Sequence, residues 1–149
     1  MDYSRKQIDD AWECAQQVEG YDPKVCRKDP CGAWIKYDQY GEQSEYGWNI
    51  DHIMPKTLFE LSRYEFSENR RAMHWENNNK KSDDFPIYTG IITSDGNHNI
   101  QKESAFNISE STITNLIKSL SGLGIYIQKH KEEWVNIYGK ELVDKWIYL

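Results

Sequence analysis

A short strand pattern in the middle of the chain ends at a proline. Residues 48–53 (WNIDHI) begin with alternating apolar and polar side chains, and Pro55 follows after one further residue. Such alternation predicts a half-buried β-strand. Proline has no N–H to donate to a sheet, so the strand has to stop before it. We therefore expect Asp51 and His52 to lie at the end of a strand.

The remaining periodic segments complete an α+β pattern. Ser4 followed by Gln7 is a capping-box signal, and the apolar spacing behind it predicts a helix of about four turns ending at Gly20. Ser109 or Ser111 is expected to cap a later helix. Two further strands are expected at 33–37 and 71–75, and a helix is expected to begin at Glu76 and to end before Pro86. Residues 86–108 predict a hairpin with its turn at 94–97. Gly122 and Gly124 are expected to end the helix that Ser109 or Ser111 caps, and a final helix is expected over 127–146.

The composition is that of a folded, soluble chain of 149 residues. Six Trp and ten Tyr argue against disorder, because disordered segments are poor in aromatic residues. A transmembrane helix is excluded, since no run of about 18 apolar residues occurs. The first ten residues are charged and lack the apolar stretch of a secretory signal, which predicts a cytoplasmic protein.

The formal net charge of -6 disfavours a protein that binds DNA through one broad basic face. Positive charges nevertheless cluster in residues 24–36 and 63–81, so a local phosphate site is compatible with the acidic total. Three cysteines, an odd number, argue against a disulfide framework. No C-x-x-C pair is present, so we expect reduced thiols and no structural zinc.

Two motifs between residues 51 and 81 resemble the signature of the HNH endonuclease family. A D-H-I-x-P motif begins at Asp51, and an N-x(8)-N-x-x-K motif begins at Asn69, 17 residues after His52. Each anchor is weak by itself, but their shared order and spacing look like bacterial or phage members of the family. The resemblance implies a ββα-metal core of two strands and a helix around one divalent ion. It places this core at residues 20–84, after a helix in residues 1–19 and before a hairpin-plus-helices extension at 85–149 packed on the core.

The chemistry of these residues agrees with phosphodiester hydrolysis. That reaction needs an activated water and neutralisation of charge on the phosphoryl oxygens. We expect His52 to be the general base, because an imidazole accepts protons near neutral pH. Asp51 and Asn78 supply the hard oxygen ligands that suit one Mg²⁺ or Mn²⁺. The resemblance implies that Asn69 holds the loop and orients His52.

The basic residues near these motifs are candidates for contacts with DNA phosphates. We expect such contacts from Lys81, Lys80, Arg70 and Arg71. Asn78 and Lys81 are three residues apart, so they share one face of a helix. Asn77 and Asn79 are rivals for the role of Asn78, and His74 is expected to pack on the second strand and not to bind the ion.

Neighbouring strand residues point to opposite faces of a sheet. Asp51 and His52 can therefore serve one phosphate only if it lies at the strand's end. The segment between His52 and Asn69 lacks the family's frequent Gly-Gly turn. It carries Leu58, Phe59, Leu61, Tyr64 and Phe66 instead, so we expect a short helix that packs on the core.

Two other functions remain open from the sequence. One is a nucleic-acid-binding module that keeps the fold but does not cleave. The other is a protein-interaction domain built on the C-terminal third, where an apolar stripe runs from Trp134 to Trp146.

Overall fold

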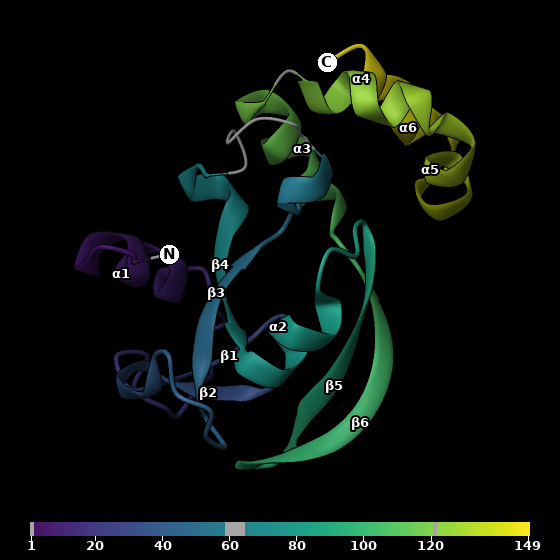
Figure 1. The fold of residues 1–149 in the computed structure, drawn as a ribbon. Coiled ribbons are helices and arrows are strands. Elements are labelled where there is room, and N and C mark those ends of the chain that lie inside the picture. The colour runs from purple at the N-terminus through teal and green to yellow at the C-terminus, as the bar shows by residue number, and fades with distance from the viewer. Residues whose placement is uncertain (1, 59–64, 121) are drawn as a thin grey trace. The chain divides into compact units, whose positions relative to one another are not determined.

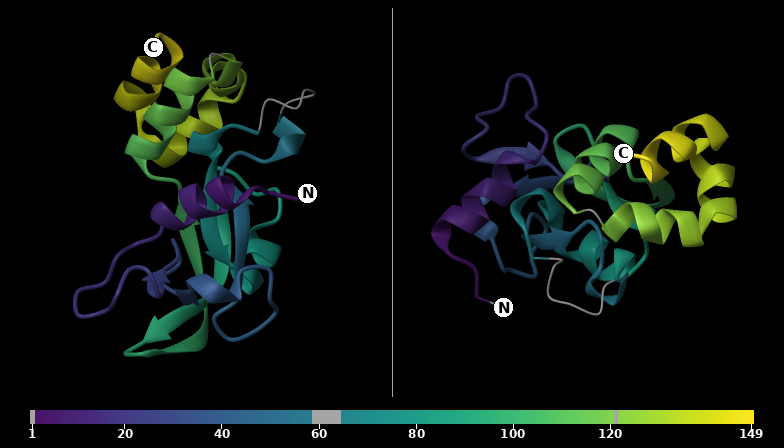
Figure 2. Two further views of the ribbon diagram at one scale, coloured as in Figure 1. Left: turned by 90° about the vertical axis from the view of Figure 1, so that its left-hand side faces the viewer. Right: turned by 90° about the horizontal axis from the view of Figure 1, so that it is seen from above.

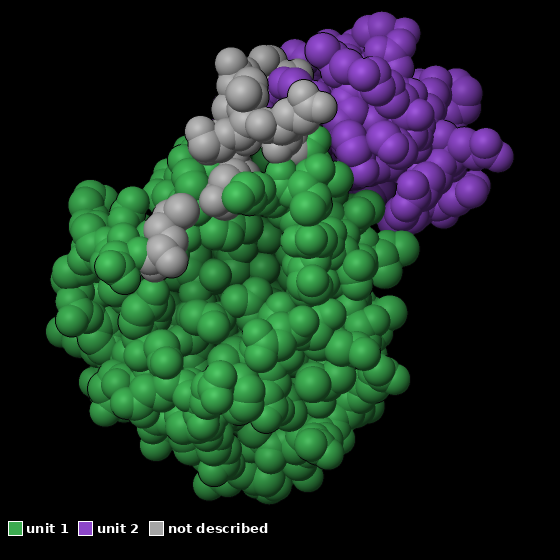
Figure 3. Space-filling view, viewed as in Figure 1, with its two compact units in different colours: residues 1–107 green, residues 108–149 purple. Residues whose placement is uncertain are grey.

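The computed structural model describes residues 2–58, 65–120 and 122–149. The chain divides into two compact units, residues 1–107 and residues 108–149, which Figure 3 colours separately. The boundary lies after the predicted hairpin and not at residue 84, where the sequence placed it. The expected short helix falls mostly on residues 59–64, which lie outside the described residues.

The first unit combines helices with antiparallel strand pairs (Figures 1 and 2). Strand β1 pairs with β2, β3 with β4, and β5 with β6. Figure 1 shows α2 between the β3–β4 and β5–β6 hairpins. The elements are α1 (Arg5–Glu13), β1 (Cys26–Lys28), β2 (Trp34–Lys36), β3 (Trp48–His52), β4 (Arg70–His74), α2 (Trp75–Lys81), β5 (Ile87–Asp95) and β6 (His98–Asn107), with short 3₁₀ helices at Tyr37–Gln39, Lys56–Leu58 and Ser67–Asn69.

Helix α1 packs an apolar stripe against the β3–β4 hairpin. The Ser4 and Gln7 side chains form the predicted capping box at its start. Ile8 and Trp12 lie one turn apart and are buried, and the rings of Trp12 and Trp48 are 5.3 Å apart. The helix ends at Glu13, well before the predicted Gly20, because Gln16 forms an antiparallel bridge with Lys28.

Strand β3 ends at His52, as its sequence predicts. In the β3–β4 register, Asp51 lies opposite Arg71 and His52 lies opposite Arg70. Helix α2 follows β4 without a loop, because the His74 side chain caps it by accepting a hydrogen bond from the Glu76 N–H. The helix ends at Ser82, whose φ of 49° breaks the helical conformation.

Two buried polar side chains join the β1–β2 turn, α2 and β5. Asp29 accepts hydrogen bonds from the backbone N–H groups of Cys31, Ala33 and His74, and from the Asn77 amide. The Asn77 Oδ1 atom accepts from the N–H groups of Ile91 and Ile92. Asn77 is therefore a structural residue, and it does not compete with Asn78 for the role of metal ligand. The hydrogen bonds between Asn77 and β5 also explain why the β5–β6 hairpin belongs to the first unit.

The β5–β6 hairpin turns between Asp95 and His98, within the predicted turn region. Gly90 lies beside an irregularity in the register. A Cβ at this position would lie 2.6 Å from the Cys31 Sγ atom, so only glycine lets β5 approach the β1–β2 turn this closely.

The second unit is helical, with α3 (Glu110–Ser119), α4 (Gly122–Lys129), α5 (Lys131–Tyr138) and α6 (Lys140–Ile147). Of the two serines expected to cap this helix, Ser109 is the N-cap of α3. The expected final helix is instead divided among α4, α5 and α6. One break lies at Gly139, whose φ is 89°. Helix α3 ends at Ser119, before the two glycines expected to break it, but Gly122 is the first residue of α4 and Gly124 lies within α4.

The apolar stripe of the C-terminal third forms the core of the second unit. Trp134 and Trp146 are buried, with ring centroids 6.1 Å apart in an edge-to-face arrangement. This stripe is therefore no exposed interaction surface. Across the described ranges, no helix is long and apolar enough to cross a membrane.

Replacing Asn77 with alanine is expected to lower the free energy of unfolding by about 2–4 kcal/mol, because the N–H groups of Ile91 and Ile92 lose their buried acceptor. Urea denaturation measures the change. Asn79→Ala is the matched control, since Asn79 is exposed on the same helix. Equal stability of the two variants would contradict the role assigned to Asn77.

Candidate functional site

A cavity of about 310 Å³ opens at the C-terminal end of β3. Asp51, His52 and Asn78, the predicted ligands and base, all line it. Its other polar lining residues come from the start of the chain, the turn after β3, the segment before β4 and the end of α2: Tyr3, Lys56, Glu65, Ser82 and Asp83. The fold thus brings the three central site residues together.

Asp51 and His52 point to opposite sides of β3, as expected for neighbouring strand residues. The Asp51 side chain is only 3% exposed and contacts Arg71 and Lys81. The His52 side chain is 22% exposed and contacts Tyr3 and Glu65. Both residues still line one cavity, because β3 ends at His52.

Asn69 is buried and fastens the turn that follows His52. Its Oδ1 atom accepts a hydrogen bond from the Met54 N–H at 2.8 Å, and its Nδ2 donates to the Met54 carbonyl at 3.0 Å. The Asn69 carbonyl also accepts from the Ile53 N–H. These bonds hold the turn on the C-terminal side of His52. That Asn69 also orients the His52 ring remains a prediction from the family resemblance.

The His52 ring is held by two side chains that the sequence did not single out. Its Nε2 atom lies 2.5 Å from Glu65 Oε1 and 3.1 Å from the Tyr3 hydroxyl. Tyr3 donates to Glu65 Oε1, and Arg70 donates to Glu65 Oε2. No pattern in the sequence distinguished Glu65 from the neighbouring Glu60 and Glu68, and none pointed to Tyr3.

These contacts also set the ionisation of Glu65. Burial is the largest influence and raises the pKa of its carboxyl. Arg70, His52 and Tyr3 together outweigh burial, so the pKa of Glu65 lies below its ordinary value. Glu65 therefore carries a negative charge at neutral pH.

Asp51 is paired with two cations. Its Oδ2 atom accepts from Arg71 Nε at 2.9 Å, and its Oδ1 atom lies 3.3 Å from Lys81 Nζ. Asp51 and Arg71 are directly opposite in the β3–β4 register, so their side chains share one face. The carboxylate is a suitable hard ligand for a divalent ion, but such an ion would compete with both cations.

Lys81 is fully buried, which contradicts its predicted contact with DNA phosphate. Its Nζ donates to the carbonyls of His52 at 2.9 Å and Ile53 at 3.2 Å. Burial lowers the pKa of Lys81, and the charge of Asp51 opposes that shift. Lys81 thus joins α2 to the end of β3, an arrangement that its spacing from Asn78 could not reveal.

The other predicted phosphate contacts also have carboxylate partners. Arg70 pairs with Glu65 at 3.0 Å, Arg71 pairs with Asp51, and Lys80 lies 3.9 Å from Glu103. The side chains of Arg70 and Arg71 are largely buried, so direct phosphate contacts from these two residues are not supported. Lys80 remains accessible, with 47% of its side chain exposed. The sequence shows that basic residues are concentrated in this region, but it does not show which carboxylates they pair with in the fold.

Asn78 is half-buried on α2, and its Nδ2 donates to Asn49 Oδ1 at 2.6 Å. His74 is buried at the start of α2 and bonds to the Glu45 carbonyl at 2.8 Å, away from the cavity lining. Within residues 2–58, 65–120 and 122–149, no group of three or more His, Cys, Asp and Glu side chains could hold a metal ion.

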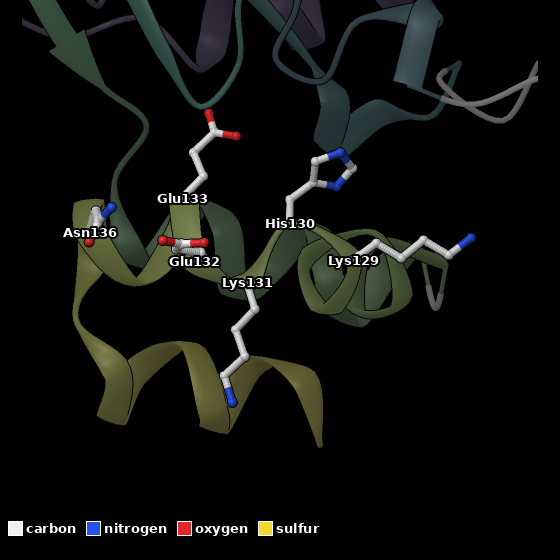
Figure 4. A pocket seen from close by; sticks show the side chains of 6 residues that line it. All are labelled: Lys129, His130, Lys131, Glu132, Glu133 and Asn136. Carbon is white, nitrogen blue, oxygen red and sulfur yellow. The ribbon is translucent and has the colours of Figure 1, made fainter.

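A second cavity, of about 440 Å³, lies at the junction of α4 and α5. Lys129, His130, Lys131, Glu132, Glu133 and Asn136 line it. In Figure 4, His130 and Glu133 extend to one side, while Lys131 and Lys129 point in other directions. They do not converge on one point, so they form no obvious catalytic arrangement.

No protein-family model matches the chain, and no curated protein or solved structure matches it either.

Removing the Lys81 ammonium is expected to destabilise the protein by about 3–5 kcal/mol, because Asp51 loses a buried partner and two carbonyls lose their donor. Lys80→Ala is the neighbouring control on α2 and should change stability by about 0.5 kcal/mol or less. Urea denaturation of Lys81→Ala and Lys80→Ala distinguishes these outcomes. Unchanged stability of Lys81→Ala would contradict the structural role assigned to Lys81.

Proposed function

We propose that this chain is a metal-dependent endonuclease of the HNH type that hydrolyses DNA phosphodiester bonds. The cavity at the end of β3 carries the proposal, because His52, Asp51 and Asn78 meet there. The order of a β3–β4 hairpin followed by α2 supports it, since the sequence resemblance implies two strands and a helix.

His52 is the general base in this proposal. It takes a proton from a water molecule, whose oxygen then attacks phosphorus in line with the departing 3′ oxygen. The bond between phosphorus and that oxygen breaks, which leaves a 5′-phosphate by family resemblance. The fixed turn after His52 and the partial exposure of its ring support this role.

Asp51 and Asn78 would hold one Mg²⁺ or Mn²⁺ through carboxylate and amide oxygens. A bound ion supplies neutralisation of phosphate charge and stabilisation of the leaving oxygen. Arg71 and Lys81 hold the Asp51 carboxylate in place through a hydrogen bond and an ion pair. They also offset part of the negative charge that would attract the ion.

A non-cleaving nucleic-acid-binding or protein-interaction module is the second candidate. The double ion pair of Asp51 favours it, because a carboxylate already balanced by two cations is a weaker site for a metal. Metal binding therefore separates the two candidates.

Wild-type protein is expected to nick supercoiled plasmid at low salt with Mg²⁺ or Mn²⁺ and to stop in EDTA. His52→Ala should reduce the rate by about 100-fold or more, the usual contribution of a general base. Low salt matters because contacts with phosphates weaken steeply as salt rises.

His98→Ala is the matched control for this assay, since His98 is exposed at the β5–β6 turn. It should cleave like the wild type. Equal cleavage by His52→Ala would exclude His52 as the base, and no cleavage by the wild type with either metal would favour the non-cleaving candidate.

Titration calorimetry with Mn²⁺ tests the metal site without any substrate. Asn78→Ala should weaken Mn²⁺ binding by about tenfold or more, since even partners outside the ligand sphere contribute that much. Asn79→Ala, which changes the exposed neighbour, should bind like the wild type. Identical affinities for both variants would remove Asn78 from the proposed ligand set.

A further inference from the structure

We infer that Glu65 is a positioning residue that fixes which nitrogen of the His52 ring carries the proton. The inference rests on the proposed nuclease function and adds a residue to its mechanism. Glu65 acts through His52, and it takes no part in the bonds that form or break at phosphorus.

The contacts around Nε2 of His52 define the tautomer. An ionised carboxylate only accepts hydrogen bonds, so Nε2 at 2.5 Å from Glu65 Oε1 has to be the donor. Tyr3 gives its own proton to Glu65 Oε1 at 3.0 Å, so its oxygen also faces Nε2 as an acceptor. Both neighbours therefore favour a proton on Nε2.

A neutral imidazole with its proton on Nε2 has its basic lone pair on Nδ1. If His52 is the base of the proposed reaction, Nδ1 is then the nitrogen whose lone pair takes the proton from water. A carboxylate that holds a histidine in one tautomer is a general device for orienting a base, and loss of the correct tautomer is costly in triad enzymes. Here the carboxylate comes from the segment just before β4, while the base ends β3.

Glu65 is itself held in place. Arg70, directly opposite His52 in the β3–β4 register, donates to Glu65 Oε2 at 3.0 Å. The side chains of Glu65 and Arg70 are 19% and 12% exposed, so solvent screens this pair less than a surface pair. Arg70 therefore serves the site by orienting Glu65.

Long-range ¹⁵N–¹H NMR of the imidazole rings tests the inference directly. The experiment uses the full chain at a pH where the rings are neutral, and the His52 signals are identified by their loss in His52→Ala. The wild type should show a protonated Nε2 at His52. Glu65→Ala and the near-isosteric Glu65→Gln should lower the population of that tautomer.

Glu68→Ala is the matched control, because Glu68 is an exposed carboxylate on the adjoining 3₁₀ helix. It should leave the tautomer unchanged. A proton on Nδ1 of His52 in the wild type, or the same tautomer population in both Glu65 variants as in the wild type, would overturn the inference.

Cleavage kinetics give the second measurement. Both Glu65 variants should lower kcat by about 100-fold with little change in KM, because the base is misplaced while substrate binding is kept. Glu68→Ala should retain both constants. Unchanged kcat in the Glu65 variants of an active enzyme would also overturn the inference.

The two measurements separate this inference from the proposed function. The NMR result depends on no activity, so it decides whether Glu65 fixes the tautomer even if the wild type cleaves no DNA. In that case the nuclease proposal alone fails, and Glu65 remains the residue that orients His52.

Discussion

The ammonium of Lys81 holds the end of β3 against α2. It is fully buried, pairs with Asp51, and donates to the carbonyls of His52 and Ile53. Those carbonyls lie where β3 ends, and Lys81 supplies a donor to each of them. Burying a charge is costly unless it is paired and hydrogen-bonded, and Lys81 meets both conditions. The position of His52 at the cavity therefore depends on a lysine that does not line the cavity.

The same ion pairs shape the chemistry that the site can support. Arg71 and Lys81 fix the Asp51 carboxylate but compensate its charge, while Arg70 fixes Glu65 beside the His52 ring. Cations that the sequence suggested for DNA thus serve to build the site. Affinity for a phosphate backbone would have to come from other side chains, such as the exposed Lys80, or from a bound metal ion.

Polar bonds also determine how far the first unit extends. Asp29 and Asn77 connect the β1–β2 turn, α2 and the bulge in β5. Both side chains are buried, so a break in either would leave unpaired polar groups inside the protein. The β5–β6 hairpin is consequently part of the unit that contains the candidate site, although the family resemblance stops before it.

Local signals in the sequence determined the capping box at Ser4, the end of β3 and the hairpin turn, because each depends on residues a few positions apart. They narrowed the cap of α3 to Ser109 or Ser111, and the structure has Ser109. The spacing of the motifs also indicated that Asp51, His52 and Asn78 would meet. Only the tertiary structure decided the partners of the charged groups. In the fold, Lys81 is buried and connects α2 to the end of β3, and Glu65 pairs with His52. Such pairings join segments far apart in the chain, and no local pattern records which carboxylate a buried cation will meet.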